Sequence, residues 1–310
     1  MTSRDYVFFS ISQLGIDDLK DFMSSLRFSH TACNVVCFYG DTDPDTLQWL
    51  QEQGVIVVPM KEYLFKIPFV QRKLNPLKWF YPVVHLYWQL FVNKKTNAVS
   101  TGSAYRFVKA LSRICTMRFF YYFEYLSDHI QEIDRVILTD VRDVLFLDSP
   151  FRESWSEGVH MFLEGDGHTI ESNKWNKYWI QKIGGDALLG EIGSKPISCA
   201  GVTYANSAEM LEYLHLMCTL LSTTIDRLDL DQGFHNVILW RSMLPNLRAG
   251  RCGHSEVLTM GLYPDEQVKF DDRGRLLNTD GSIVKIVHQY DRKSSVAGKL
   301  LQTVSGHTTQ

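Results

Sequence analysis

The sequence predicts an α/β protein in which helices flank a mainly parallel sheet. Apolar strands alternate with amphipathic helices over residues 6–60, a rhythm typical of parallel strands joined by right-handed crossovers. The apolar run 136–138 is continuous, as in a strand buried on both faces. Hydrophobic residues make up 45% of the 310 residues, which is enough for a sizeable core.

The N-terminal part shows the alternation most clearly. Strands are expected at 6–11, 34–39 and 55–60. Between the first two strands, apolar residues recur at helical spacing over 17–26. The second helix is expected to begin after Asp43, whose carboxylate suits an N-cap, with Pro44 at the first helical position.

The rest of the chain continues without a linker, so we expect one domain over 1–310, with halves of about 1–150 and 151–293. Further helices are expected at 104–129, 207–221 and 232–239. Further strands are expected at 136–138, 159–163, 198–204, 257–262, 269–270 and 283–288. The glycine-rich stretch 183–193 is expected to form a loop with a short helix. The tail 294–310 is polar and is expected to be loose.

Composition and charge exclude several classes of protein. A formal net charge of −3 gives no basis for a nucleic-acid partner. No CxxC pair occurs among the 6 cysteines, and the N-terminus lacks a basic segment followed by an apolar one. We therefore expect a cytoplasmic protein whose thiols act as small apolar groups.

The stretch 79–92 is apolar and aromatic, and lysines flank it. It is too short to span a bilayer, and it contains Pro82 and His85. Two interpretations stay open. One is a helix packed on the domain core, and the other is an interfacial helix that contacts a membrane peripherally.

Two acids, Asp140 and Asp143, interrupt an otherwise apolar stretch after the strand expected at 136–138. A buried carboxylate is costly unless it is paired, hydrogen-bonded or bound to a metal. Ligands of open α/β sheets bind at the carboxyl ends of strands. Because side chains three apart on a flat strand point to opposite faces, the two carboxylates converge only where the chain bends. We expect a metal site here; the alternative is that Arg142 pairs with an acid and Asp143 caps a turn.

A second polar group follows the last expected strand, where His288 is followed by Asp291, Arg292 and Lys293. Imidazole combined with carboxylates suits Mn²⁺ or another first-row ion better than Ca²⁺. The two cations suit a phosphate. A histidine at a strand end is often only structural, so the assignment depends on His288 meeting the two aspartates.

Two further motifs have residues suited to ligand contact. Asp231 and Gln232 stand where a loop meets a helix, and they either bind ligand hydroxyls or cap the helix. Small residues surround Gly201 in the run CAGV, which lets a ligand approach the backbone closely. A buried strand beside a glycine bend explains that run equally well.

Taken in order, these motifs resemble those of the GT-A nucleotide-sugar glycosyltransferases, especially the retaining enzymes of glycosyltransferase family 8. The matching segments are RFFYYFEYL with Arg118, TDVRDV with the two aspartates, CAGV, LDQGFHN and VHQYDR. Each motif is weak alone, whereas five in the family's order are fairly specific. The resemblance implies a GT-A (Rossmann-like) fold with a mixed, mainly parallel sheet. Residues 1–150 would bind the nucleotide, and 151–293 would form the acceptor and catalytic half.

The resemblance also implies a role for each residue. Asp140, Asp143 and His288 would hold a divalent metal, with Mn²⁺ favoured over Mg²⁺, and Asp231 and Gln232 would be the catalytic pair. Donor contacts would come from Ser10, Ile11, Arg118, Gly201, Arg292 and Lys293. The implied reaction moves a sugar from a nucleoside-diphosphate sugar, a UDP-sugar being favoured, to a glycan or other acceptor with retention. The aromatic residues Trp175, Tyr178 and Trp179 would stack on an acceptor sugar, and core packing is the alternative for them.

The chain departs from the family pattern in three places. The acids are spaced D-x-x-D, Cys199 stands where the family has a sugar-binding Asn, and the segment after His288 lacks the family's Gly-x-x-Lys-Pro-Trp run. Two other functions therefore stay open. One is a catalytically silent module that binds a nucleotide sugar or carbohydrate. The other is a phosphohydrolase of the haloacid dehalogenase type. The segment TDVRDVLF of this chain fits the signature of that type poorly.

Overall fold

The structure is a computed structural model that describes residues 3–29, 31–61, 109, 114–153, 155–165, 167–223 and 230–305. The stretch 79–92, considered above for a membrane contact, and most of 104–113 lie outside these residues. In the described part of the chain, no helix is long and apolar enough to cross a membrane.

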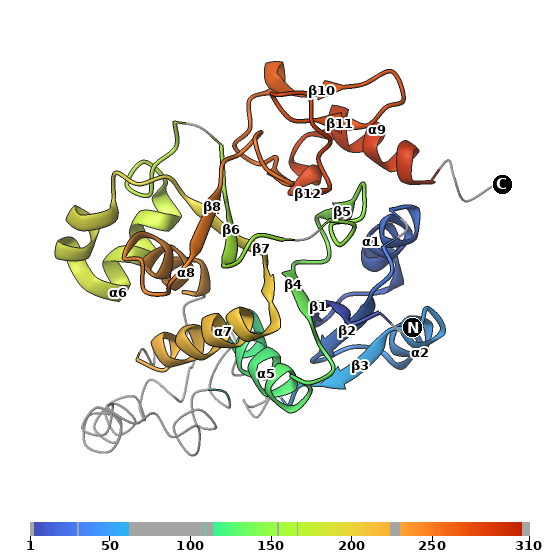
Figure 1. The fold of residues 1–310 in the computed structure, drawn as a ribbon, viewed down its shortest axis with the longest axis horizontal. Helices are drawn as coiled ribbons and strands as arrows, with labels where there is room; N and C mark the ends of the chain where they lie inside the picture. Colours follow the sequence, from blue (N-terminus) through green and yellow to red (C-terminus); the bar gives the residue numbers. More distant parts are fainter. Residues whose placement is uncertain are drawn as a thin grey trace, which may run out of the picture.

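A mixed seven-stranded sheet with the order β3-β2-β1-β4-β7-β6-β8 forms the centre of the fold (Figure 1). Strands β1 to β4 of this sheet are parallel, β7 is antiparallel to both of its neighbours, and β8 is parallel to β6. The strands are β1 (Asp5–Ile11), β2 (Asn34–Tyr39), β3 (Ile56–Pro59), β4 (Arg135–Thr139), β6 (Val159–Leu163), β7 (Ser198–Asn206) and β8 (Leu247–Gly250). The α/β class with a mostly parallel mixed sheet is thus confirmed, and the arrangement is compatible with a Rossmann-like fold.

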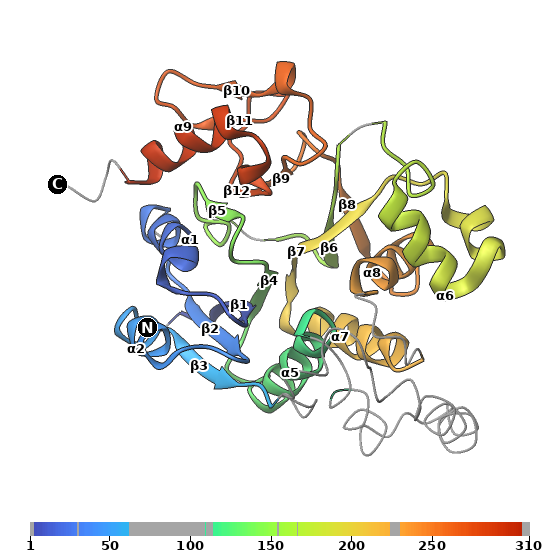
Figure 2. The ribbon, with the colours of Figure 1, turned by 180° about the vertical axis from the view of Figure 1, so that it is seen from behind.

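Helices cover both faces of this sheet, as the views from the front and from behind show (Figures 1 and 2). The helices are α1 (Ile16–Phe28), α2 (Pro44–Glu52), α5 (Ile114–Asp128), α6 (Lys174–Ile192), α7 (Ser207–Leu221), α8 (Asp231–Trp240) and α9 (Ser294–Ser305). Strand β1 alternates between the two faces: Phe8 packs in one core with α5 and α7, and Phe9 packs in the other with α1. The expected N-cap of α2 is confirmed, because Asp43 Oδ1 accepts a hydrogen bond from Thr46 N at 2.9 Å.

A small second sheet pairs the C-terminal part of the chain with a segment from the middle of the sequence. It has the order β5-β12-β9, formed by Val144–Phe146, Ile286–His288 and Val257–Thr259. Strand β12 is antiparallel to β5, and in this register His288 lies opposite Val144. The residue before Val144 is Asp143, so the pairing itself places the imidazole beside the mid-chain acids. A short hairpin of β10 (Lys269–Phe270) and β11 (Leu276–Leu277) lies nearby in the sequence.

One sequence expectation was partly right and another was wrong. In the stretch 183–193, Gly184 and Gly185 have non-helical backbones, Gly185 with φ of 67°, and the expected short helix follows them as the second part of α6, which buries Leu188 and Ile192. The expected loop is only a kink at these two glycines, with a helical segment on each side. The tail is not loose over its first part, since α9 buries Val296, Leu300 and Val304 at helical spacing.

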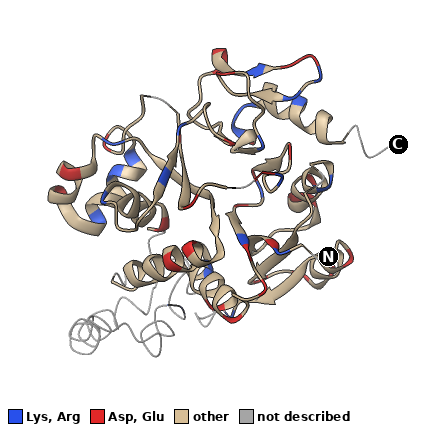
Figure 3. Cartoon of the chain, in the orientation of Figure 1, with Lys and Arg blue, Asp and Glu red and all other residues tan. Residues whose placement is uncertain are grey.

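Charged residues of both signs are interspersed over the described ribbon, and Lys and Arg do not gather on one side of it (Figure 3).

Candidate functional site

Asp140, Asp143 and His288 converge just beyond the end of β4. Their ligand atoms all lie within 4.8 Å of one another. His288 Nε2 is 3.7 Å from Asp140 Oδ2 and 3.6 Å from Asp143 Oδ1, which is too long for hydrogen bonds. Two ligands bound about 2.1 Å from one ion are separated by roughly 3–4 Å. The spacing and the donor set therefore fit a divalent cation.

The local fold explains how carboxylates three apart converge. Strand β4 ends at Thr139, the next four residues bend, and β5 begins at Val144. At the bend, Asp140 N donates to Gly201 O at 2.8 Å, which extends the contact with β7 by one residue. The predicted bend is confirmed, and it turns both side chains toward His288.

Gly201 makes room for the imidazole. A Cβ atom at this position would lie 2.2 Å from His288 Cε1, 2.5 Å from His288 Nε2 and 3.0 Å from Asp140 Oδ2. Any side chain would therefore displace a candidate metal ligand. The sequence interpretation gave Gly201 a contact with a donor. The structure shows that its backbone lies against the imidazole of His288, a candidate metal ligand, and the donor contact stays a prediction.

His288 is held in a tightly enclosed position. Its side chain is 2% exposed, and Nδ1 is buried without a hydrogen-bond partner among the described residues. A buried imidazole with one nitrogen facing two carboxylates has few partners available except a cation or a proton.

Arg118 of α5 links Asp140 to Asp231. Its Nη1 donates to Asp140 Oδ1 at 2.5 Å, and its Nη2 donates to Asp231 Oδ2 at 3.1 Å. Burial alone would raise the pKa of Asp140, but Arg118 and then His288 lower it below the usual value. The pKa of Asp143 is raised, because burial outweighs the attraction of His288. Asp140 is therefore a carboxylate whose negative charge is balanced by Arg118, whereas the charge of Asp143 is not balanced to the same extent.

A cleft of about 410 Å³ opens beside the three candidate ligands, a volume typical of small-molecule sites. It is lined by Ser10, Ser12, Leu14, Ile114, Cys115, Arg118, Asp140, Val141, Arg142, Asp143, Asp291 and Arg292. The structure thus brings Ser10, Arg118 and Arg292, three of the expected donor-binding residues, to one cavity with two of the expected metal ligands.

Three other expected donor-binding residues, Ile11, Gly201 and Lys293, do not line this cleft. Ile11 is 1% exposed, and its side chain packs in the core with Phe9 because it lies on the opposite face of β1 from Ser10. Lys293 forms an ion pair with Asp265. Ile11 therefore forms no part of the cleft wall, and Lys293 is paired with a carboxylate elsewhere.

Asp231 and Gln232 begin α8, but neither is its N-cap. The capping residue is Leu230, and no side chain caps the helix, so the capping interpretation of the pair is wrong. Asp231 is paired with Arg118 instead. Gln232 Nε2 donates to Glu164 Oε1 and to Asn176 Oδ1, each at 3.2 Å. Both residues are therefore fixed by polar contacts to other elements.

Glu164 and Asn176 belong to this network and were not assigned a role from the sequence. Glu164 is 6% exposed, and burial raises the pKa of its carboxyl above the ordinary value of 4.5. It directly follows the buried strand β6, so the signal that identified Asp140 was present for Glu164 too. Asn176 lies on α6, whose N-terminal half was not expected to be helical, and no signal in the sequence identifies it.

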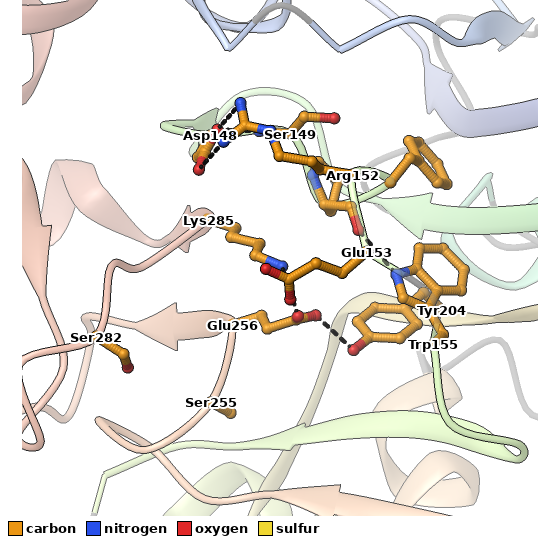
Figure 4. Close-up of polar contacts among 12 residues, drawn as sticks. Asp148, Ser149, Arg152, Glu153, Trp155, Tyr204, Ser255, Glu256, Ser282 and Lys285 are labelled. Atoms are coloured by element: carbon orange, nitrogen blue, oxygen red, sulfur yellow. Dashed lines mark hydrogen bonds and ion pairs between the residues drawn. The ribbon is translucent and has the colours of Figure 1, made fainter.

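A polar cluster outside the cleft joins β7 to the start of β12 (Figure 4). Lys285 Nζ donates to Glu256 Oε1 at 2.7 Å and to Glu153 Oε2 at 3.2 Å. Tyr204 OH donates to the other oxygen of Glu256 at 2.7 Å. Lys285 precedes His288 by three residues, and Tyr204 follows Gly201 by three, so the cluster is a second attachment between the two segments that meet at the site.

Neither a protein-family model nor a curated protein matches the sequence. The fold and the site are therefore the observations that define its class: an α/β protein with a candidate metal centre at the carboxyl end of the central strand of a mixed sheet.

Proposed function

We propose that the protein is a metal-dependent glycosyltransferase of the GT-A type. It would move a sugar from a nucleoside-diphosphate sugar, a UDP-sugar being favoured, to a glycan or other acceptor with retention. The observation that carries the proposal is the convergence of His288 with Asp140 and Asp143 beside a cleft of about 410 Å³. The resemblance to the GT-A enzymes predicts that these three residues form one metal site, and their convergence supports that prediction.

Asp140, Asp143 and His288 would hold the metal, Mn²⁺ being favoured over Mg²⁺ because one ligand is an imidazole. The metal, when bound, would supply positive charge to the diphosphate leaving group. Arg292 lines the same cleft and would add a further charge where negative charge develops. Ser10, near the end of β1, lines the same cleft and would contact the nucleoside.

Arg118 has a more specific role in this proposal than a donor contact. Both of its terminal nitrogens are engaged by carboxylates, one on Asp140 and one on Asp231. It would therefore hold Asp231, one of the two proposed catalytic residues, in a fixed relation to the candidate metal ligand Asp140, which is the kind of positioning on which transfer reactions depend.

The first test is ligand-dependent stabilisation. We expect UDP together with Mn²⁺ to raise the melting temperature, because a ligand at 100 times its Kd stabilises the folded state by about 2.7 kcal/mol. Asp143→Ala should abolish this shift. Asp17→Ala removes a carboxylate whose side chain is 94% exposed on α1, and it should leave the shift unchanged.

Turnover of nucleotide sugars is the second measurement. Hydrolysis or transfer of a UDP-sugar should require Mn²⁺ and should be lost in Asp143→Ala. Turnover that persists with a chelator and in Asp143→Ala would contradict the metal-dependent mechanism. Release of phosphate from small phosphate esters would instead favour a phosphohydrolase.

A catalytically silent binding module is the second candidate. Cys199 favours it, because the family that the chain resembles has a sugar-binding Asn at this position. Its thiol occupies the neighbourhood of the proposed catalytic amide, with Sγ 3.6 Å from Gln232 Oε1. Burial raises the pKa of this thiol well above its ordinary value, so it stays neutral and is a poor nucleophile. Binding of UDP with Mn²⁺, without turnover of any nucleotide sugar, is the result that this candidate predicts.

A further inference from the structure

We propose that Asn176 is a positioning residue that fixes the side-chain amide of Gln232 in one orientation. The constraint begins at the N-cap of α6 and passes through two amides. The catalytic relevance of Gln232 rests on the proposed function, whereas the orientation itself follows from the hydrogen bonds.

The first step is the cap. Asn173 Oδ1 accepts hydrogen bonds from Trp175 N at 3.0 Å and from Asn176 N at 3.1 Å. Backbone N–H groups only donate, so the atom of Asn173 that faces them has to be its oxygen. The side chain of Asn173 therefore presents an acceptor to its neighbours on α6.

The second step is that the oxygen of Asn173 fixes which end of the Asn176 side-chain amide faces it. Its Nδ2 lies 3.2 Å from Asn173 Oδ1, so the nitrogen of the Asn176 amide faces the cap. Its oxygen consequently faces the other way, toward Gln232 Nε2 at 3.2 Å. Asn176 is 4% exposed, so water offers little alternative to these partners.

The third step fixes Gln232. Its Nε2 has two hydrogens, and it faces two acceptors, Asn176 Oδ1 and Glu164 Oε1. Its Oε1 accepts from the Cys199 thiol at 3.6 Å. A flipped amide would set Oε1 against two oxygens and turn Nε2 toward the sulfur. All the partners therefore agree on one orientation, in which the carbonyl oxygen retains spare acceptor capacity.

This relay, the hydrogen-bonded series Asn173, Asn176 and Gln232, connects residues from separate parts of the fold. Asn173 and Asn176 come from the N-terminal turn of α6, Glu164 follows β6, and Gln232 begins α8. The N-terminal part of helix α6, which the sequence did not predict, thus sets the orientation of the side chain that follows Asp231, the partner of Arg118.

The side-chain amide protons of Gln232 provide a direct test that does not depend on activity. In protein labelled with ¹⁵N on glutamine side chains, the Gln232 signals are assigned by their loss in Gln232→Leu. Both protons should exchange at least about tenfold more slowly than those of an exposed glutamine, as protected hydrogen bonds do. Asn176→Leu should remove that protection from one proton. Asn173→Asp preserves every acceptor and is the matched control, with protection unchanged.

Kinetics then tests the positioning role. If a UDP-sugar is turned over, Asn176→Leu should lower kcat about tenfold, the effect of one lost hydrogen bond, with donor KM within about twofold of wild type. Gly190→Ala, at an open position of α6 outside the relay, should retain kcat. Unprotected Gln232 protons in the wild-type protein, or protection unchanged in Asn176→Leu, would overturn the relay. Protection as expected without turnover by the wild type would leave the relay standing and overturn the transferase assignment.

Discussion

Gly201 is the residue on which the geometry of the site depends most directly. Gly201→Ala places a methyl group where the His288 ring lies, 2.2 Å from Cε1. We expect a loss of about 1–3 kcal/mol in the free energy of unfolding, as for other overpacked cores. Because the imidazole has to move, stabilisation by Mn²⁺ should be lost as well. Urea unfolding with and without Mn²⁺ measures both effects.

Gly190 on α6 is the matched control for this substitution. Nothing lies within 4 Å of a Cβ built there, and the backbone is helical. Gly190→Ala should therefore stabilise the protein by up to about 1 kcal/mol, since alanine is the better helix former. Retained stabilisation by Mn²⁺ in Gly201→Ala would contradict the role given to the glycine.

Residues of the site were predictable where burial made their chemistry conspicuous. Asp140 and Asp143 stood out because carboxylates rarely follow an apolar strand without a partner. Lys293 did not differ from Arg292 in the sequence, and only the fold shows that Asp265 pairs with Lys293 while Arg292 lines the cleft. Such choices depend on side-chain directions that a linear pattern does not contain.

At the scale of elements, the polar cluster around Lys285 holds β12 against β7. Lys285 is 9% exposed, and Glu256 bridges it to Tyr204. We expect Glu256→Gln to cost about 1–3 kcal/mol, the range for hydrogen bonds that involve charged groups. Denaturant unfolding at neutral pH is the measurement.

The same substitution at the neighbouring acid provides the comparison. The Glu153 side chain is 71% exposed, although it also pairs with Lys285. Glu153→Gln should therefore change stability by less than about 1 kcal/mol. Equal losses in the two variants would show that the cluster does not act through Glu256.

Elements were predicted well where caps and periodicity agreed. Helix α7 has the expected bounds, and α2 begins at the expected cap. The glycine pair in α6 predicts a loop and a short helix, and the structure has a kink at those glycines with a helical segment after them, whereas the segment before them, which begins at Lys174, was not predicted. Helix α9 was missed because its polar residues concealed three apolar positions at helical spacing.

At the scale of the whole molecule, acid sensitivity should follow from the buried His235. Its side chain is fully buried between Ser198 Oγ and Tyr213 OH, and burial, followed by the charge of Arg118, lowers its pKa from 6.5 to about 3. Between these values the unfolded chain binds a proton that the folded protein does not. Stability should therefore fall as pH drops from 6.5 toward 3, by up to about 1.4 kcal/mol per pH unit from this group.

His235→Gln should reduce that slope, measured as the free energy of unfolding at several pH values between 7 and about 4. The same change at His254, which is exposed, should leave the slope as in the wild type. Identical slopes in the wild type and His235→Gln would show that another group dominates acid unfolding.

The α/β class of the whole molecule was predictable from the alternation of strands and helices in the first 60 residues. The antiparallel insertion of β7 and the separate sheet of β5, β12 and β9 were not, because such pairings join segments far apart in the chain. The meeting of His288 with the aspartates could be stated only as a consequence of the family resemblance, and the register of β12 against β5 supplies the physical reason for it.

The pairing of β12 with β5 also sets an order of events during synthesis. The parallel strands β1 to β4 and both aspartates leave the ribosome long before His288 does. The nascent chain therefore carries only two of the three candidate ligands until its last strand emerges, and the proposed centre could not close around an ion before then. Any product that stops short of residue 286 would retain the N-terminal strands but lack the third ligand.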